Sequence, residues 1–383
     1  MLNYLLRLFQ DYDFPGHNLM NYLSFRAMLA AVISMLIAFL AGGRIIEWLR
    51  NHQIGEMVRD LGLEGQGQKK GTPTMGGLII VISLLVSVLL VCRLDSIYTI
   101  LLLITTVWCG GIGFADDYIK VFKHNKNGLS EKAKLILQFG LGLVVALTIC
   151  LSPDIPTDKL ITTIPFVKAH EFDYSWLSPF KGQLGVYCSW GIYMLMIIVV
   201  VLACSNGANL TDGLDGLATG TSATIGVVVG VMAWLSGDVL DAEYLNIMYI
   251  PGTGEVAVFM AAFVGALIGF LWYNTHPALV FMGDTGSLTI GGIIGVSAVL
   301  IRKELILPLL CGVFFVECLS VLIQRCCYKY TKHKYGKGRR VFLMTPIHHH
   351  YEKKGLPEPR IVTRFWIIGI ILAVMTLALL KIR

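Results

Sequence analysis

The sequence predicts an all-α polytopic membrane protein with about ten transmembrane helices and a functional site on its cytoplasmic face. Of the 383 residues, 55% are hydrophobic and 15% are charged. The mean hydropathy of +0.69 is typical of a membrane protein. Ten apolar stretches approach the roughly 17 to 25 residues that cross a bilayer as a helix. Acidic residues recur where these stretches meet the aqueous phase.

The ten predicted spans are separated by short polar connections. They lie near residues 24–43, 75–92, 97–115, 134–152, 187–204, 217–235, 255–272, 286–301, 304–324 and 364–381. The eighth is short and rich in glycine, so it matches a membrane span least well. Because the number of spans is even, both termini are expected on the same side of the membrane.

Lysine and arginine set the orientation of the predicted spans. They are concentrated in the connections after the first, third and ninth spans, whereas the connection 236–254 has none. Loops rich in these residues stay on the cytoplasmic side. The sequence therefore predicts that the odd-numbered connections are cytoplasmic and that both termini are periplasmic.

Five aspartates lie at the cytoplasmic ends of predicted spans. Asp116 and Asp117 follow the third span in FADDY, Asp212 and Asp215 follow the fifth in NLTDGLDG, and Asp284 precedes the eighth in FMGDTGS. A charge near the hydrocarbon costs roughly 2.5 to 3.5 kcal/mol, so such carboxylates usually mark an ion, proton or substrate site. If the span ends meet, their oxygens suit a hard cation such as Mg2+ and the phosphates that it carries.

Two further polar segments fall on the same predicted face. QKKGTPTMGG precedes the second span and contains Lys70 and Thr74, and MTPIHHHYEKKG precedes the tenth and contains His348, His349 and His350. Glycines beside these residues permit tight turns and close backbone approach, which a phosphate-binding lining requires.

Each motif also has a structural interpretation. Asp116 and Asp117 are consistent with a helix end, although the helix dipole disfavours carboxylates at a C-terminus. An alternative interpretation makes Asp215 an N-cap of the sixth span and Phe281 a lipid-facing side chain. The histidine run could form a metal site, but adjacent histidines rarely point in one direction. Contacts to phosphate are the favoured interpretation of the run.

The motifs GTPTMGG, GFADDY, NLTDGLDGLA, FMGDTGSL and PIHHHYEKKG, in this order, closely resemble the phospho-N-acetylmuramoyl-pentapeptide transferase family. That family belongs to the polyprenyl-phosphate N-acetylhexosamine-1-phosphate transferases, and the triple histidine favours the muramoyl branch. The resemblance covers nearly the whole chain.

The resemblance implies a single membrane domain over residues 1–383 in the bacterial cytoplasmic (inner) membrane, surrounded by membrane lipid. The implied reaction transfers phospho-MurNAc-pentapeptide from UDP-MurNAc-pentapeptide to undecaprenyl phosphate, and it gives lipid I and UMP for peptidoglycan synthesis. Mg2+ is the implied cofactor, a homodimer is expected, and no nucleic-acid partner is expected.

The resemblance also implies roles for individual residues. The implied catalytic residues are Asp116, Asp117, Asp284 and His348, with Asp284 and Asp117 holding Mg2+ and Asp116 deprotonating or orienting the lipid phosphate. Lining the diphosphate and sugar are Asn209, Asp212 and the run His348 to His350, with Thr74 nearby. The implied uridine contacts are Lys70, Asp215, Asn274 and Phe281, whose ring would stack on uracil. Direct attack by the lipid phosphate is preferred to a phospho-aspartate on Asp117, and both routes remain open.

Two other functions are weighed against this one. A transferase that uses UDP-GlcNAc would share the aspartate motifs. A cation-coupled transporter would place its acidic residues near the bilayer midplane, beside discontinuous helices.

Overall fold

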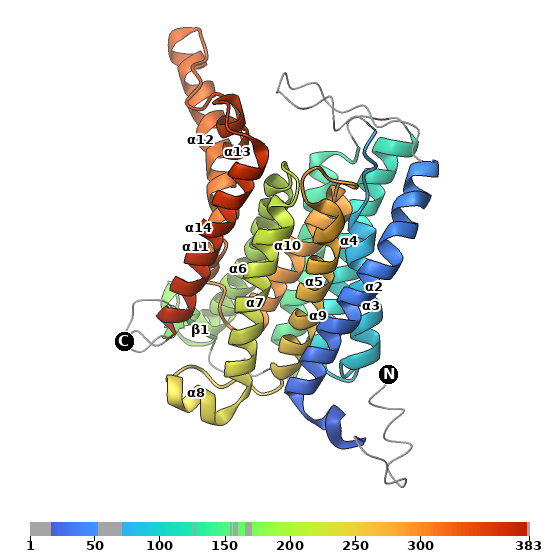
Figure 1. Ribbon diagram of the computed structural model, residues 1–383. Helices are drawn as coiled ribbons and strands as arrows, with labels where there is room; N and C mark the ends of the chain where they lie inside the picture. Colours follow the sequence, from blue (N-terminus) through green and yellow to red (C-terminus); the bar gives the residue numbers. More distant parts are fainter. Residues whose placement is uncertain are drawn as a thin grey trace.

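The computed structural model describes residues 17–52, 71–123, 125, 128–153, 155, 160–164 and 171–380. The described part is a bundle of long helices with one small sheet at one end (Figure 1). In chain order, its elements are η1 (His17–Asn21), α2 (Leu23–His52), α3 (Gly77–Val91), α4 (Ile97–Phe122), α5 (Glu131–Leu151), β1 (Ile161–Thr163), β2 (Glu171–Asp173), η3 (Tyr174–Leu177), α6 (Gly182–Thr211), α7 (Leu217–Gly237), α8 (Val239–Leu245), α9 (Gly254–Asn274), α10 (Gly283–Leu300), α11 (Leu307–Leu310), α12 (Gly312–Tyr335), α13 (Ile347–Lys353) and α14 (Glu358–Leu379).

Each of the ten predicted spans coincides with a helix, which confirms the all-α membrane class. Within the described residues, eight helices are long and apolar enough to cross a membrane: α2, α4, α5, α6, α7, α9, α10 and α14. The second predicted span is α3, an apolar helix of 15 residues. The ninth is mainly α12, which falls short by composition because it carries Glu317 and continues as a basic segment after Ile323.

The ends of the helices divide the bundle into two faces. In Figure 1, α2 begins and α14 ends at the bottom, whereas α13 and the protruding carboxyl-terminal half of α12 lie at the top. Since α4 and α6 end at the top and α10 begins there, the acidic motifs share that face. Because α2 begins and α14 ends on the same face, the helices cross the bundle an even number of times, as predicted.

The centre of the bundle is α10, the predicted span with the weakest apolar signal. It is 89% buried over its apolar window, against 28% for α2, and it packs against α3, α4, α6 and α7. Small residues allow this enclosure: a Cβ on Gly113 of α4 would lie 2.2 Å from the Asp284 carbonyl oxygen. Close backbone contact through glycine is how membrane helices gain packing without a hydrophobic driving force.

The two strands lie at the opposite end of the bundle from the acidic motifs. They pair antiparallel, with Ile161 opposite Asp173 and Thr163 opposite Glu171. The Thr163 amide donates to the Arg302 carbonyl at 3.1 Å, and Lys303 Nζ donates to Thr163 Oγ1 at 2.6 Å. These contacts fix the strand pair to the segment that follows α10.

Candidate active site

Three carboxylates from two helices meet at one end of the bundle. Asp116 and Asp117 of α4 and Asp284 of α10 each place a carboxylate oxygen within 4.8 Å of the others. Asp116 is fully buried and Asp117 is 2% exposed. Because α4 continues to Phe122, the boundary predicted at residue 115 is wrong, and the aspartate pair lies inside the last turns of the helix.

Asp117 joins α4 to the amino terminus of α10. Its carboxylate accepts hydrogen bonds from the Asp284 amide at 3.1 Å, the Thr285 amide at 2.9 Å and Thr285 Oγ1 at 2.7 Å. The first amides of a helix have no partner within it, and they favour an anion. A Cβ at Gly283, which has φ of +72°, would lie 2.6 Å from Asp117 Oδ2. Asp117 therefore fixes the position of Asp284, the residue that follows Gly283.

Two lysines that the sequence assigned only to membrane orientation lie within the carboxylate cluster. Lys134 Nζ lies 2.5 Å from Asp284 Oδ2 and 3.0 Å from Asp116 Oδ1. Lys120 Nζ lies 2.5 Å from Asp116 Oδ2 and 3.4 Å from Asp284 Oδ2. Three carboxylates against two ammonium groups leave a formal charge of −1. The cluster can therefore bind both a cation and the anionic oxygens of a phosphate.

Asn209 at the end of α6 belongs to the same cluster. Its Nδ2 donates to Asp284 Oδ1 and to Ser287 Oγ, both at 3.0 Å. Asp212 is the C-cap of α6 and its amide donates to the carbonyl oxygens of Ala208 and Asn209. Asp212 therefore lies just past the helix and is half-buried at the rim.

The GTPTMGG segment lies directly against the segment that precedes Asp284. The Phe281 amide donates to the Pro73 carbonyl at 2.9 Å, and the amides of Gly76 and Gly77 donate to the carbonyls of Phe281 and Met282 at 2.8 Å. Thr74 is 7% exposed, and its Oγ1 lies beside Gly283. Phe281 is half-buried. Lys70 lies outside the described residues.

Asp215 is part of a second polar cluster with His276 and Glu358. Its carboxylate accepts from the Ala278 amide at 3.1 Å and lies 3.2 Å from His276 Nδ1. Its own amide donates to Glu358 Oε1 at 2.7 Å. The N-cap of α7 is Gly216, so the alternative interpretation of Asp215 as that cap is wrong.

Asn274, the last residue of α9, connects the loop before α7 to the segment before α10. Its Oδ1 accepts from the Gly216 amide at 3.1 Å and from Thr219 Oγ1 at 2.8 Å, and its Nδ2 donates to the Val280 carbonyl at 3.1 Å. The side chain is 3% exposed. These bonds tie the loop before α7 to the segment before α10, a structural task that the sequence did not indicate.

We expect Asn274→Ala to lower the free energy of unfolding by roughly 1 to 3 kcal/mol, because it leaves buried backbone groups unsatisfied. Thermal unfolding of the purified protein in detergent measures the change. The neighbouring exposed Thr275→Ala serves as the control. Equal stability of the two variants would contradict the structural role of Asn274.

The three adjacent histidines face three different partners. Fully buried His348 places Nδ1 3.1 Å from Glu317 Oε2, and its Nε2 lies against Gly213 of the loop before α7. His349 Nδ1 lies 2.5 Å from Glu352 Oε2, and His350 Nδ1 accepts from the Leu343 amide at 3.1 Å. Desolvation and nearby Lys354 lower the pKa of His350. The run therefore does not converge on one ion, and only His348 reaches the loop between Asp212 and Asp215.

Comparison with known proteins gives consistent matches. The profile of glycosyl transferase family 4 matches residues 99–302, and the phospho-N-acetylmuramoyl-pentapeptide-transferase signature 1 matches residues 69–81. Proteins named phospho-N-acetylmuramoyl-pentapeptide-transferase from Parabacteroides distasonis and Flavobacterium psychrophilum are each 52% identical to the chain. One from Bacteroides thetaiotaomicron is 47% identical. In all three comparisons, the alignment covers 100% of both sequences.

Proposed function

The chain belongs to the phospho-N-acetylmuramoyl-pentapeptide transferase family, and from this membership we infer how its residues carry out the reaction. It transfers phospho-MurNAc-pentapeptide from UDP-MurNAc-pentapeptide to undecaprenyl phosphate, forming lipid I and UMP in peptidoglycan synthesis. The observation that best supports this site is the meeting of three carboxylates, two lysines and Asn209 where α4, α5, α6 and α10 come together.

Mg2+ fits the donor set of the carboxylate cluster. Magnesium prefers oxygen ligands, and it typically takes one or two carboxylates together with water and substrate phosphate. We assign Asp284 and Asp117 as its ligands. Asp117 is held by three hydrogen bonds from the start of α10, whereas the Asp284 carboxylate contacts the side chains of Asn209, Lys120 and Lys134, of which the lysines can turn toward a bound phosphate. We therefore assign Asp284 as the principal ligand. Bound Mg2+ would neutralise the charge of the diphosphate.

Lys120 and Lys134 supply the remaining positive charge. Phosphoryl transfer between two anions depends mainly on positioning and on charge stabilisation. We assign the two lysines to the phosphate oxygens, where they hold the UDP diphosphate and the lipid phosphate close together. Each already lies between two carboxylates, which fixes its direction.

We favour direct attack by the lipid phosphate. An oxygen of undecaprenyl phosphate forms a bond to the phosphorus that bears the sugar, and the bond from that phosphorus to the bridging oxygen breaks, releasing UMP. Asp116 is fully buried, and both lysines contact it. These contacts favour orientation of the lipid phosphate through the lysines over proton removal by Asp116.

The first experiment measures transfer of radiolabelled phospho-MurNAc-pentapeptide to undecaprenyl phosphate by the purified protein. We expect chelation with EDTA to abolish transfer and added MgCl2 to restore it. UDP-GlcNAc in excess should compete poorly. Transfer that persists after chelation would reject the metal assignment. A parallel assay uses radiolabelled UDP-GlcNAc as the donor, and labelled lipid product in that assay would change the assigned substrate.

A second prediction concerns the nucleotide side of the site, which we assign to Phe281, Asp215 and Lys70, with Asn274 positioning the segment before α10 through its hydrogen bond to the Val280 carbonyl. Stacking of a base on an aromatic ring is worth about 1 to 3 kcal/mol. Phe281→Ala should therefore weaken binding of the UDP substrate by roughly tenfold to a hundredfold. The KM for undecaprenyl phosphate, which carries no base, should hardly change. Equal losses for both substrates would show that Phe281 supports the fold instead.

The cellular setting follows from the family and from the helices. The eight apolar helices make this a multi-pass membrane protein, and we propose that it resides in the bacterial cytoplasmic membrane as a homodimer. Mass measurement of the detergent-solubilised protein by light scattering tests the dimer.

A further inference from the structure

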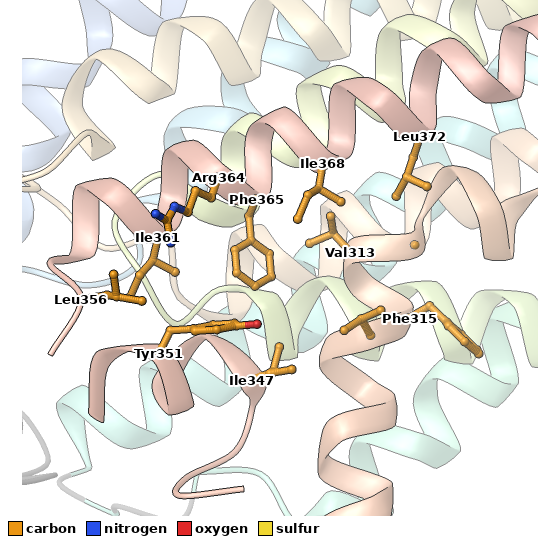
Figure 2. A pocket seen from close by; sticks show the side chains of 12 residues that line it. Val313, Phe315, Ile347, Tyr351, Leu356, Ile361, Arg364, Phe365, Ile368 and Leu372 are labelled. Atoms are coloured by element: carbon orange, nitrogen blue, oxygen red, sulfur yellow. The ribbon is translucent and has the colours of Figure 1, made fainter. Parts of the chain in front are cut away.

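An apolar groove runs between α12, α13 and α14, apart from the carboxylate cluster (Figure 2). Its volume is about 410 Å³, within the range of roughly 300 to 1,000 Å³ that holds small ligands in other proteins. Along its length it is lined by Val313, Phe315, Ile361, Phe365, Ile368 and Leu372. Tyr351 and Arg364 lie at one end (Figure 2).

The groove opens on the outer surface of the helix bundle. Ile368 is 48% exposed and Phe315 is 53% exposed, on two helices that the sequence predicts to cross the membrane. From Arg364 to Leu372 the groove follows α14 for about 12 Å at 1.5 Å per residue. A hydrocarbon chain in the bilayer can therefore enter it from the side.

Positive charge surrounds the end of the groove that lies toward the acidic-motif face. Exposed Arg364 lines it, and Arg360 is exposed one turn earlier on α14. Lys354 Nζ lies 6.0 Å from the ring centroid of Tyr351. Basic pockets between membrane helices on the cytoplasmic side bind anionic lipid head groups.

Glu317 of α12, Glu352 of α13 and Glu358 of α14 are each engaged by other groups. Glu317 lies 3.1 Å from His348 Nδ1. Glu352 contacts His349. Glu358 accepts from the Asp215 amide and lies 3.4 Å from His276. The rim of the groove is therefore complementary to a phosphate.

We propose that this groove binds an acyl chain of an anionic phospholipid of the cytoplasmic leaflet, with the lipid phosphate at Arg364. The lining residues come from α12, α13 and α14, whereas the carboxylates and lysines come from α4, α5 and α10. No residue belongs to both sites, so the lipid is an auxiliary ligand. Since Ile347 and Tyr351 of α13 contact the chain, the bound lipid braces the short helix that carries His348.

Binding of a fluorescent phosphatidylglycerol to the delipidated protein in detergent tests the proposal, with phosphatidylcholine as the comparison lipid. Phosphatidylglycerol should bind more tightly. One basic residue near a charged lipid surface contributes about 1 kcal/mol, so Arg364→Gln should weaken binding by about fivefold. Arg325→Gln, the same change at an exposed position of α12 outside the groove, should leave binding unchanged.

A second pair of variants tests the apolar part of the groove. Ile368→Trp fills it and should abolish saturable binding, whereas Ile367→Trp, at an exposed neighbouring position outside the lining, should not. Equal affinity for the two lipids, or unchanged binding in Arg364→Gln and Ile368→Trp, would overturn the proposal. So would displacement of phosphatidylglycerol by undecaprenyl phosphate at concentrations that saturate transfer, because the groove would then belong to the substrate.

Discussion

Replacing Asp284 by Asn should lower turnover by roughly 10²- to 10³-fold or more, on the scale of removing one preorganised electrostatic group from an active site. The side chain keeps its size and its contact with Asn209, but it loses the charge that two lysines now face. Because Asp284 is the assigned principal Mg2+ ligand, the half-saturating Mg2+ concentration should also rise. Initial rates of transfer measured over a series of Mg2+ concentrations test both effects.

Glu47→Gln provides the matched control, because it removes one carboxylate from an exposed position of α2. It should transfer at the normal rate. Thermal unfolding separates lost chemistry from lost structure, and the Asp284 variant should unfold near the temperature of the parent protein. Near-normal turnover of Asp284→Asn at saturating Mg2+ would contradict the metal assignment.

Lys134→Met should produce the second large loss, again on the order of 10²- to 10³-fold in turnover. The substitution keeps an unbranched apolar stem and removes the ammonium group that joins Asp116 to Asp284. Its effect on Mg2+ should be opposite to that of Asp284→Asn. With one lysine absent, the cluster is more negative, so the half-saturating Mg2+ concentration should fall while turnover collapses.

Lys132→Met is the control for this change, since Lys132 is exposed two residues earlier on α5. It should alter neither turnover nor Mg2+ dependence. A Lys134 variant that loses activity and needs more Mg2+ would show that the lysine helps to form the metal site, and its assignment to phosphate would be wrong.

The fold could be predicted from the sequence because two local features define it. The length of each apolar stretch predicts a membrane span, and the lysines and arginines between the stretches predict the orientation of the spans. All ten predicted spans coincide with helices. The errors lie at helix ends, where polar residues continue a helix beyond the apolar core. The span predicted at 134–152 begins at Glu131, after Ser130 accepts the Ala133 amide as an N-cap. That cap places Lys134 in the first turn of α5, where it can face α4.

The candidate site followed from the sequence less completely. Glycine-flanked aspartates at span ends indicated Asp116, Asp117 and Asp284, and the structure brings these together. Lys120 lies four residues after Asp116, a spacing that pairs charges on a helix. Lys134 and Glu358 carry no such local signal, because their partners are distant in the chain. The roles assigned to Asp212, Asp215 and the histidines remain predictions.

The enclosure of α10 also has a consequence for biogenesis. At a mean hydropathy of 1.3, the lowest of the eight apolar helices, α10 gains little from contact with lipid, and its glycines leave few side chains to bury there. Its partners α3, α4, α6 and α7 all precede it in the chain. During synthesis these four helices are present before α10 leaves the ribosome. We therefore expect α10 to insert between helices that are already in the membrane, and not directly into lipid. Asp284, the proposed Mg2+ ligand, would thus enter the membrane protein late, together with the helix that completes its core.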